Sequence, residues 1–178
     1  MRTLVLGGIR SGKSRWAEEA IATSLPPGQP VRYLAPRVAG QADADWADRV
    51  ARHRDRRPPH WSTVETDDVT GQLRQSPGSP TLVDDLGGWL TGTLDRNQAW
   101  DDGSVAGPVE AMISAVGEFG STLVLVSPEV GLTVVPATAA GRRFADELGS
   151  LNQRIAELCD RVVLVVAGQA VQIKPSGT

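Results

Sequence analysis

The feature that most constrains this chain is a complete phosphate-binding loop near its start. Residues 7–14 read GGIRSGKS, which matches G-x-x-x-x-G-K-[ST], and an apolar run at residues 3–6 leads directly into it. Such a motif is diagnostic when a buried strand precedes it and a helix follows, and residues 14–23 have the composition of a helix. The glycines let backbone N–H groups surround a polyphosphate, and the positive end of the helix faces the same anion.

The whole loop is therefore a predicted nucleotide site. We expect the Lys13 ammonium to reach the outer phosphates and the Ser14 hydroxyl to bind Mg²⁺. The predicted loop residues are Gly7, Gly8, Ile9, Arg10, Ser11, Gly12, Lys13 and Ser14.

The rest of the chain alternates apolar runs with helical patterns. Strands are predicted at 3–6, 31–35, 81–83, 122–126 and 162–166, with a further strand at 170–173. Helices are predicted at 14–23, 43–56, 67–75, 88–96, 108–118 and 137–160. This alternation predicts an α/β fold of the P-loop NTPase kind, with a mostly parallel central sheet covered by helices on both faces.

Size and composition exclude several other classes of protein. A chain of 178 residues is expected to form one domain over residues 1–178, and its single cysteine, Cys159, cannot form an internal disulfide. A net charge of −3 argues against a broad nucleic-acid surface. The sequence contains no apolar stretch long enough for a membrane span and no signal-like start, so we expect a cytoplasmic protein.

A second polar cluster lies in residues 43–57, which read DADWADRVARHRDRR and stop at a Pro-Pro pair. Wound as a helix, this segment places Arg49, Arg52 and Arg56 on one arc, with His53 at the border of an apolar arc. Arginine grips phosphate oxygens in pairs, and a histidine beside such a cluster could act as a covalent nucleophile. A histidine on a basic helix is more often a solvated surface residue, so the residues alone leave both interpretations open.

Together these motifs resemble a known enzyme family. The phosphate loop is followed by RVARHRDRRPPHW at 49–61, TLVDDL at 81–86, VSPEVGLTVVP at 126–136 and FADELGSLNQRIAELCD at 144–160. In this order and spacing they look like the bifunctional adenosylcobinamide kinase and adenosylcobinamide-phosphate guanylyltransferase of cobalamin biosynthesis. The likeness covers nearly the whole chain.

The resemblance implies two reactions. ATP or GTP phosphorylates adenosylcobinamide, and a histidine matching His53 then takes GMP from GTP, releasing pyrophosphate, and passes it to adenosylcobinamide phosphate to give adenosylcobinamide-GDP. It also implies a trimer with corrinoid sites between subunits. Beyond the phosphate loop, the matching nucleotide-binding positions are Pro36, Arg37, Val38, Arg54, Asp55, Arg56, Arg57, Glu65 and Asp84.

Asp84 ends a predicted strand, where an acidic residue commonly organises Mg²⁺, so Ser14 and Asp84 are the predicted metal ligands. Asp85 is an alternative to Asp84, and Glu129 is a further candidate near the site. Both could equally be caps of the structure that follows them.

The chain departs from the family pattern at two positions, Pro36 and Pro128, where hydrogen-bonding side chains are usual. Neither touches the phosphate loop or His53, so we expect both half-reactions to survive. Two other functions remain to be separated from this one. They are a simple small-molecule kinase and a nucleotide-gated binding protein without catalysis.

Overall fold

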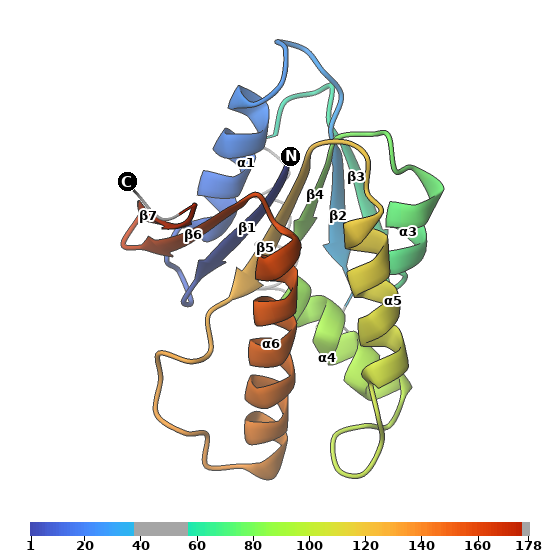
Figure 1. Ribbon diagram of the computed structural model, residues 1–178, viewed down its shortest axis with the longest axis vertical. Helices are drawn as coiled ribbons and strands as arrows, with labels where there is room; N and C mark the ends of the chain where they lie inside the picture. The colour runs from blue at the N-terminus through green and yellow to red at the C-terminus, as the bar shows by residue number, and fades with distance from the viewer. Residues whose placement is uncertain (38–56, 176–178) are drawn as a thin grey trace.

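The computed structural model describes residues 1–37 and 57–175. Over these residues the chain forms a seven-stranded sheet in the order β3-β2-β4-β5-β1-β6-β7 (Figure 1). The strands are β1 (Arg2–Gly7), β2 (Arg32–Pro36), β3 (Ser62–Thr66), β4 (Thr81–Asp84), β5 (Leu123–Pro128), β6 (Arg161–Val166) and β7 (Gln169–Lys174). The helices are α1 (Lys13–Thr23), α3 (Val69–Gln75), α4 (Leu86–Arg96), α5 (Ala106–Gly117) and α6 (Ala139–Leu158).

The predicted fold class is confirmed by the pairing of these strands. Neighbouring strands from β3 to β6 run parallel, and only β7, at the edge, pairs antiparallel with β6. All strands of the parallel part therefore end at the same edge of the sheet. In Figure 1 the arrowheads of β1, β2, β4 and β5 point toward the same end of the molecule.

Helices cover both faces of the sheet and bury two apolar clusters. Helix α1 contributes Ala17 and Ile21 to one cluster, where they pack with side chains of β1, β2, β4, β5 and β6. Helices α3, α4, α5 and α6 bury the larger cluster on the opposite face. The continuous apolar runs of the inner strands follow from this double burial, since β5 is buried at each of Leu123 to Ser127.

Side-chain caps fix the starts of three helices. Asp68, Asp85 and Thr138 accept hydrogen bonds from the backbone N–H groups of Gly71, Gly88 and Gly141, at the starts of α3, α4 and α6. The prediction of a helix over 137–160 was therefore too long at both ends. It begins after the Thr138 cap, and its chain turns extended at Cys159.

One strand was missed by the sequence patterns. Strand β3 is short and polar, and it lies at the edge of the sheet with Ser62 and Glu65 exposed. A half-exposed edge strand does not produce the continuous apolar run that marked the inner strands.

Two predictions concern more than the described residues. The predicted helix at 43–56 lies outside them, and the single domain over 1–178 stays a prediction. Among the helices in the described part of the chain, none has the length and apolar character needed to cross a membrane.

Candidate nucleotide site

The predicted phosphate loop lies at the edge of the sheet where the parallel strands end. Gly7 is the last residue of β1 and pairs with Pro128 of β5 and Val165 of β6. The expectation that Pro128 does not touch the phosphate loop was therefore wrong, because parallel pairing of β1 with β5 brings it beside the first loop residue. The loop then turns into α1, whose first residue is Lys13. The positive end of α1 therefore faces the space enclosed by the loop, as an anion site requires.

Two glycines of the loop are required by its geometry. A Cβ on Gly7 would lie 2.5 Å from Ser11 Oγ and 2.7 Å from the carbonyl oxygen of Val165, closer than real contacts allow. Gly12 has φ of +93°, in the left-handed region that favours glycine, and faces Gly168 of the β6–β7 turn. The N–H of Gly168 donates to the carbonyl of Ser11 at 2.8 Å, so this turn supports the loop from behind.

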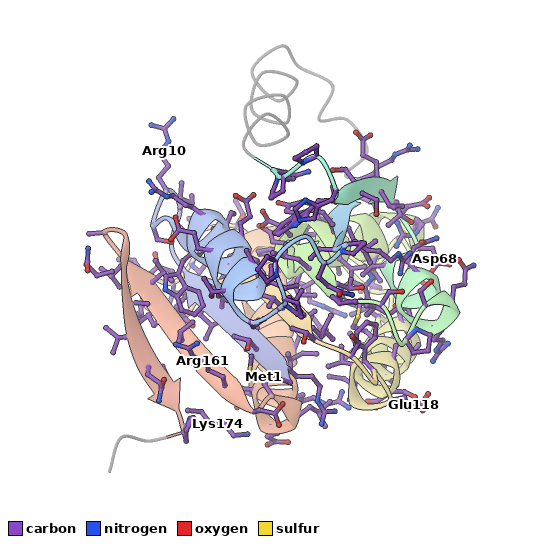
Figure 2. All side chains as sticks on the ribbon, turned by 90° about the horizontal axis from the view of Figure 1, so that it is seen from above. Met1, Arg10, Asp68, Glu118, Arg161 and Lys174 are labelled. Carbon is purple, nitrogen blue, oxygen red and sulfur yellow. The ribbon has the colours of Figure 1, made fainter. Side chains whose placement is uncertain are left out.

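The tip of the loop is open. Ile9 is 95% exposed, and Arg10 adopts a left-handed φ of 56°. Figure 2 shows the Arg10 side chain extending outward, away from the body of the molecule. Lys13 Nζ donates to the carbonyl of Gly8 at 3.4 Å, so its ammonium lies across the loop that would hold the phosphates.

The two predicted metal ligands lie together although 70 residues separate them. Ser14 Oγ donates to Asp84 Oδ1 at 3.2 Å, across the end of β5, the strand between β1 and β4. A hydroxyl and a carboxylate oxygen suit Mg²⁺, which in nucleotide sites takes one or two protein ligands and completes its shell with phosphates and water. In the described part of the chain, no group of three or more His, Cys, Asp and Glu could hold a metal by itself.

The two other acidic candidates near the metal site, Asp85 and Glu129, bond to backbone N–H groups close to them in the chain. Asp85 caps α4, with Oδ1 accepting from the N–H of Gly88 at 2.8 Å. Burial, and then the neighbouring Asp84 charge, raises the pKa of Asp85 above its ordinary value. Glu129 turns back on its own loop and accepts from the N–H of Gly131 at 2.6 Å.

On the other side of the sheet edge, β2 and β3 carry further predicted residues. Pro36 is buried at the end of β2 and pairs with Thr66. Arg37 follows it and faces Glu65, with 3.8 Å between Nε and Oε2 and side chains 67% and 48% exposed. This pair is open to solvent, so both residues are available to a ligand.

Arg57, a predicted nucleotide-binding residue that the structure describes, lies against α1 and β2. Its guanidinium carbon is 3.3 Å from the centre of the Tyr33 ring, and Nη1 donates to Thr63 Oγ1 at 2.8 Å. Its Nε lies 3.8 Å from Oε1 of Glu18 on α1, and the two side chains are only 7% and 13% exposed. Its direct contact with a nucleotide stays a prediction.

Sequence reasoning missed Tyr33, whose hydroxyl donates to Asp84 Oδ2 at 2.5 Å. Burial, and then the charge of Asp84, raises the pKa of Tyr33 well above its ordinary value, so the hydroxyl remains a donor. A signal was present, since Tyr33 is the only tyrosine of the chain and lies, next to Arg32, within the otherwise apolar run 31–35.

The motif at 144–160 contains the triplet Leu-Asn-Gln at 151–153, and Asn152 of α6 connects it to the same edge of the sheet. Its side chain accepts from Ser127 Oγ at 2.6 Å and donates to the carbonyl of Pro128 at 3.0 Å. The N–H of Glu129 in turn donates to the carbonyl of Gly7 at 3.1 Å. Asn152 therefore fixes the end of β5, against which the phosphate loop begins.

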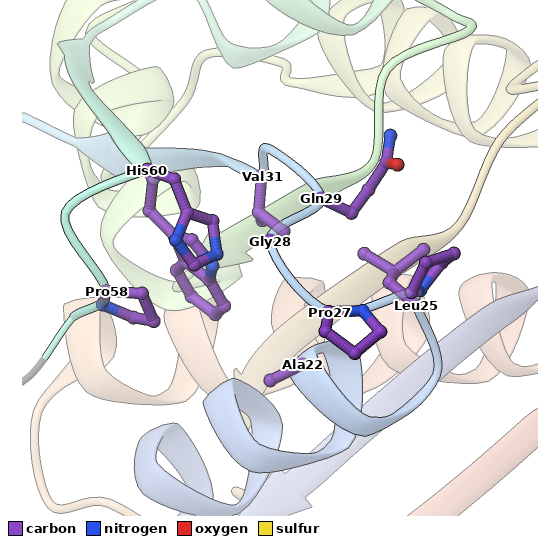
Figure 3. Close-up of a pocket in the computed structure, with 10 residues that line it drawn as sticks. Ala22, Leu25, Pro27, Gly28, Gln29, Val31, Pro58 and His60 are labelled. Atoms are coloured by element: carbon purple, nitrogen blue, oxygen red, sulfur yellow. The ribbon is translucent and has the colours of Figure 1, made fainter.

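A cavity near α1 lies at the end of that helix opposite the phosphate loop. It measures about 200 Å³ and is lined by Ala22, Leu25, Val31 and His60 among others (Figure 3). These residues come from the end of α1 and the segments before β2 and β3, so the cavity is separate from the phosphate loop. His60 lines this cavity and is exposed.

Strand, glycine loop, helix, and the Ser14–Asp84 pair together define a P-loop nucleotide-binding protein of the α/β class. A family model described as cobinamide kinase / cobinamide phosphate guanyltransferase matches residues 3–173. The chain belongs to this family, as its motifs indicated, and it is a transferase of cobalamin biosynthesis.

Curated relatives agree over almost their entire length. The chain is 44% identical to the bifunctional adenosylcobalamin biosynthesis protein CobP of Pseudomonas aeruginosa, covering 98% of both chains. It is 35% identical to the bifunctional adenosylcobalamin biosynthesis protein CobU of Salmonella typhimurium, covering 98% of this chain and 100% of that protein. Among solved structures, it is similar to the P4 protein from bacteriophage phi6 in complex with ADP. That match has a TM-score of 0.40 and 14% identity, over 96% of this chain and 53% of that one.

Several predicted site residues lie outside the described residues. They include the predicted nucleophile and four of the predicted nucleotide-binding residues. They are Val38, His53, Arg54, Asp55 and Arg56.

Proposed function

We propose that this protein performs both reactions on one corrinoid substrate. It phosphorylates adenosylcobinamide with ATP or GTP, and it then transfers GMP from GTP to adenosylcobinamide phosphate, giving adenosylcobinamide-GDP and pyrophosphate. The observation that carries the proposal is the phosphate loop with Ser14 and Asp84 already in contact, in a chain of this family.

For the kinase step, the loop would hold the phosphate tail and Lys13 would move from the Gly8 carbonyl to the outer phosphates. The substrate hydroxyl oxygen forms a bond to the γ-phosphorus and gives up its proton to solvent, while the bond from the γ-phosphorus to the β-phosphate oxygen breaks and the nucleoside diphosphate leaves with that electron pair. Ser14 and Asp84 would hold Mg²⁺, which supplies neutralisation of charge on the phosphate oxygens.

For the guanylyl step, an imidazole nitrogen of His53 would attack the α-phosphorus of GTP. A phosphorus–nitrogen bond forms, and the bond to pyrophosphate breaks. A phosphate oxygen of adenosylcobinamide phosphate then displaces the histidine and takes the GMP group. Arg54, Asp55, Arg56 and Arg57, together with Pro36, Arg37, Val38 and Glu65, would surround the nucleotide.

The position of Arg57 supports this assignment. His53 precedes it by four residues, which limits the separation of their Cα atoms to roughly 14 Å even in an extended chain. Arg57 is in turn anchored beside Glu18 of α1, the helix that begins at the phosphate loop. This chain length allows His53 to reach the helix that would receive the phosphates.

Labelling tests the histidine most simply. After incubation with Mg²⁺ and GTP labelled at the α-phosphate, we expect acid-labile label on the protein, lost in His53→Asn. The matched control is His60→Asn, because the chain has two histidines and His60 is exposed away from the loop. Label retained by His53→Asn removes His53 from this role.

The two alternative functions give different results. A simple kinase would phosphorylate a hydroxyl substrate without releasing pyrophosphate from GTP, and a nucleotide-gated binding protein would turn over neither corrinoid. We further propose that the protein assembles as a trimer with corrinoid sites between subunits, as the family resemblance implies. Light scattering tests the trimer, since a monomer at working concentration would contradict it.

A further inference from the structure

The carboxylate of Asp84 is held at both of its oxygens. Ser14 Oγ donates to Oδ1 at 3.2 Å, and the Tyr33 hydroxyl donates to Oδ2 at 2.5 Å. The two donors come from different sides of the carboxylate, Ser14 from α1 and Tyr33 from β2, the strand beside β4. With one oxygen engaged by Tyr33, the other is presented to the phosphate loop.

The Tyr33 ring is itself fixed. It is 2% exposed and belongs to the apolar cluster beneath α1, with Ala17 and Ile21. Arg57 lies over the ring at 3.3 Å from its centre and is held by Thr63 at 2.8 Å. A ring packed in this way has little rotational freedom, so its hydroxyl is presented in one direction.

A buried phenol needs a hydrogen-bond partner in any fold, so a contact with Asp84 could be simple satisfaction of the core. The other carboxylate oxygen argues for a role beyond satisfying a buried phenol, because Asp84 Oδ1 also contacts Ser14 of the phosphate loop. Nucleotide sites depend on groups whose orientation is set before the ligand arrives. A carboxylate with Oδ2 free could rotate and offer either oxygen.

We propose that Tyr33 is a positioning residue for the metal–nucleotide site, and that its hydroxyl fixes Asp84 so that Oδ1 and Ser14 Oγ together face the incoming Mg²⁺. This inference rests on the proposed role of Ser14 and Asp84 as metal ligands. Arg57, four residues after His53, stacks on the same Tyr33 ring, so one side chain contacts both Asp84 and the first described residue after the predicted helix at 43–56.

The test measures binding of GDP to the protein with Mg²⁺ and with EDTA, without any corrinoid. Tyr33→Phe removes the hydroxyl and keeps the ring. We expect it to weaken binding roughly tenfold in Mg²⁺, as loss of a hydrogen bond to a charged group should. In EDTA the affinity should stay within about twofold, since the phosphate loop itself is unchanged.

Leu34→Val is the matched control. Leu34 is the next residue of β2, fully buried in the cluster on the opposite face, and its shortening should lower thermal stability without touching Asp84. We expect Mg²⁺ to increase the GDP affinity of Leu34→Val by the same factor as in the unsubstituted protein. If Tyr33→Phe weakens binding equally in Mg²⁺ and EDTA, or not at all, Tyr33 has no positioning role.

Asp84→Asn separates this inference from the proposed function. Suppose that Mg²⁺ no longer increases GDP affinity in Asp84→Asn but still does so fully in Tyr33→Phe. The proposal for Tyr33 is then overturned, and the metal role of Asp84 stands. If Mg²⁺ still increases GDP affinity in Asp84→Asn, the metal role of Asp84 fails, and the positioning role of Tyr33 fails with it.

A spectroscopic measurement gives an independent result. Because Tyr33 is the only tyrosine, fluorotyrosine incorporation gives one fluorine NMR resonance. In the GDP complex, adding Mg²⁺ should shift this resonance, and Asp84→Asn should abolish the shift. A resonance that does not move when Mg²⁺ increases GDP affinity contradicts contact between Tyr33 and the metal-binding carboxylate.

Discussion

The two sides of the sheet edge that carries the site are built differently. On the β1–β5–β6 side, backbone fixes the phosphate loop, because Gly7 has no space for a side chain and Gly168 donates to Ser11 at 2.8 Å. On the β2–β3 side, the outermost contact is the Arg37–Glu65 pair, 3.8 Å apart and largely exposed. The first side is preset for a phosphate tail, and the second remains free to adjust to the rest of the ligand.

The largest effect should come from comparing two adjacent glycines of the phosphate loop. Gly7→Ala would force a methyl group against Ser11 and the Val165 backbone, whereas a Cβ on Gly8 meets nothing within 4 Å. We expect Gly7→Ala to lose nucleotide binding and about 1–3 kcal/mol of stability, with Gly8→Ala keeping the stability of the original. Thermal unfolding and GDP binding measure both. Equal losses in the two variants would mean that the loop is not fixed at Gly7.

A similar loss of stability, without a methyl group placed in the phosphate loop itself, should follow from Asn152→Ala, behind the loop. The substitution leaves the Ser127 hydroxyl and the Pro128 carbonyl without their Asn152 contacts. We expect a destabilisation of about 1–3 kcal/mol in denaturant unfolding. Gln153→Ala, at the exposed neighbouring position, is the control and should change little. No difference between them would show that α6 does not support the end of β5.

Arg57 lies between the phosphate-loop side and the β2–β3 side. Arg57→Ala therefore tests whether tight packing continues from the first side to the second. The variant removes the stack on Tyr33, the bond to Thr63 and the charge near Glu18. We expect a loss of about 1–2 kcal/mol. Arg57→Lys keeps the charge without the planar stack and should recover only part of it. Full recovery with lysine would show that charge alone matters here.

The smallest change in stability should come from the open side. Arg37→Ala and Glu65→Gln remove an exposed, long ion pair, so unfolding free energy should change by less than about 0.5 kcal/mol. If these residues meet the nucleotide as proposed, the KM for GTP should still rise. A loss of stability with no change in the KM for GTP would contradict this expectation, because Arg37 and Glu65 would then stabilise the fold and not bind the nucleotide.

The sequence predicted the phosphate-loop side well because its signals are local. Strand, glycine loop and helix follow one another within residues 2–23, and each element agrees with its own pattern. The pairing of Ser14 with Asp84 also followed, since an acidic residue at a strand end reaches the common edge of a parallel sheet.

The β2–β3 side was harder to predict because it depends on strand order. Nothing in the residues tells that β2 lies beside β4, and this adjacency brings Tyr33 to Asp84 across 51 positions of sequence. Strand β3 escaped notice because Ser62–Thr66 is polar and half exposed. The role of Asn152 likewise depends on how α6 packs, although its motif was visible.

The decisive measurement is a structure of the protein with Mg²⁺ and a non-hydrolysable GTP analogue. We expect the triphosphate inside the loop at residues 7–14, with Lys13 Nζ on its outer phosphates and Mg²⁺ between Ser14 Oγ and Asp84. A triphosphate bound elsewhere, such as the groove lined by Arg15, Glu19 and Trp61, would contradict it.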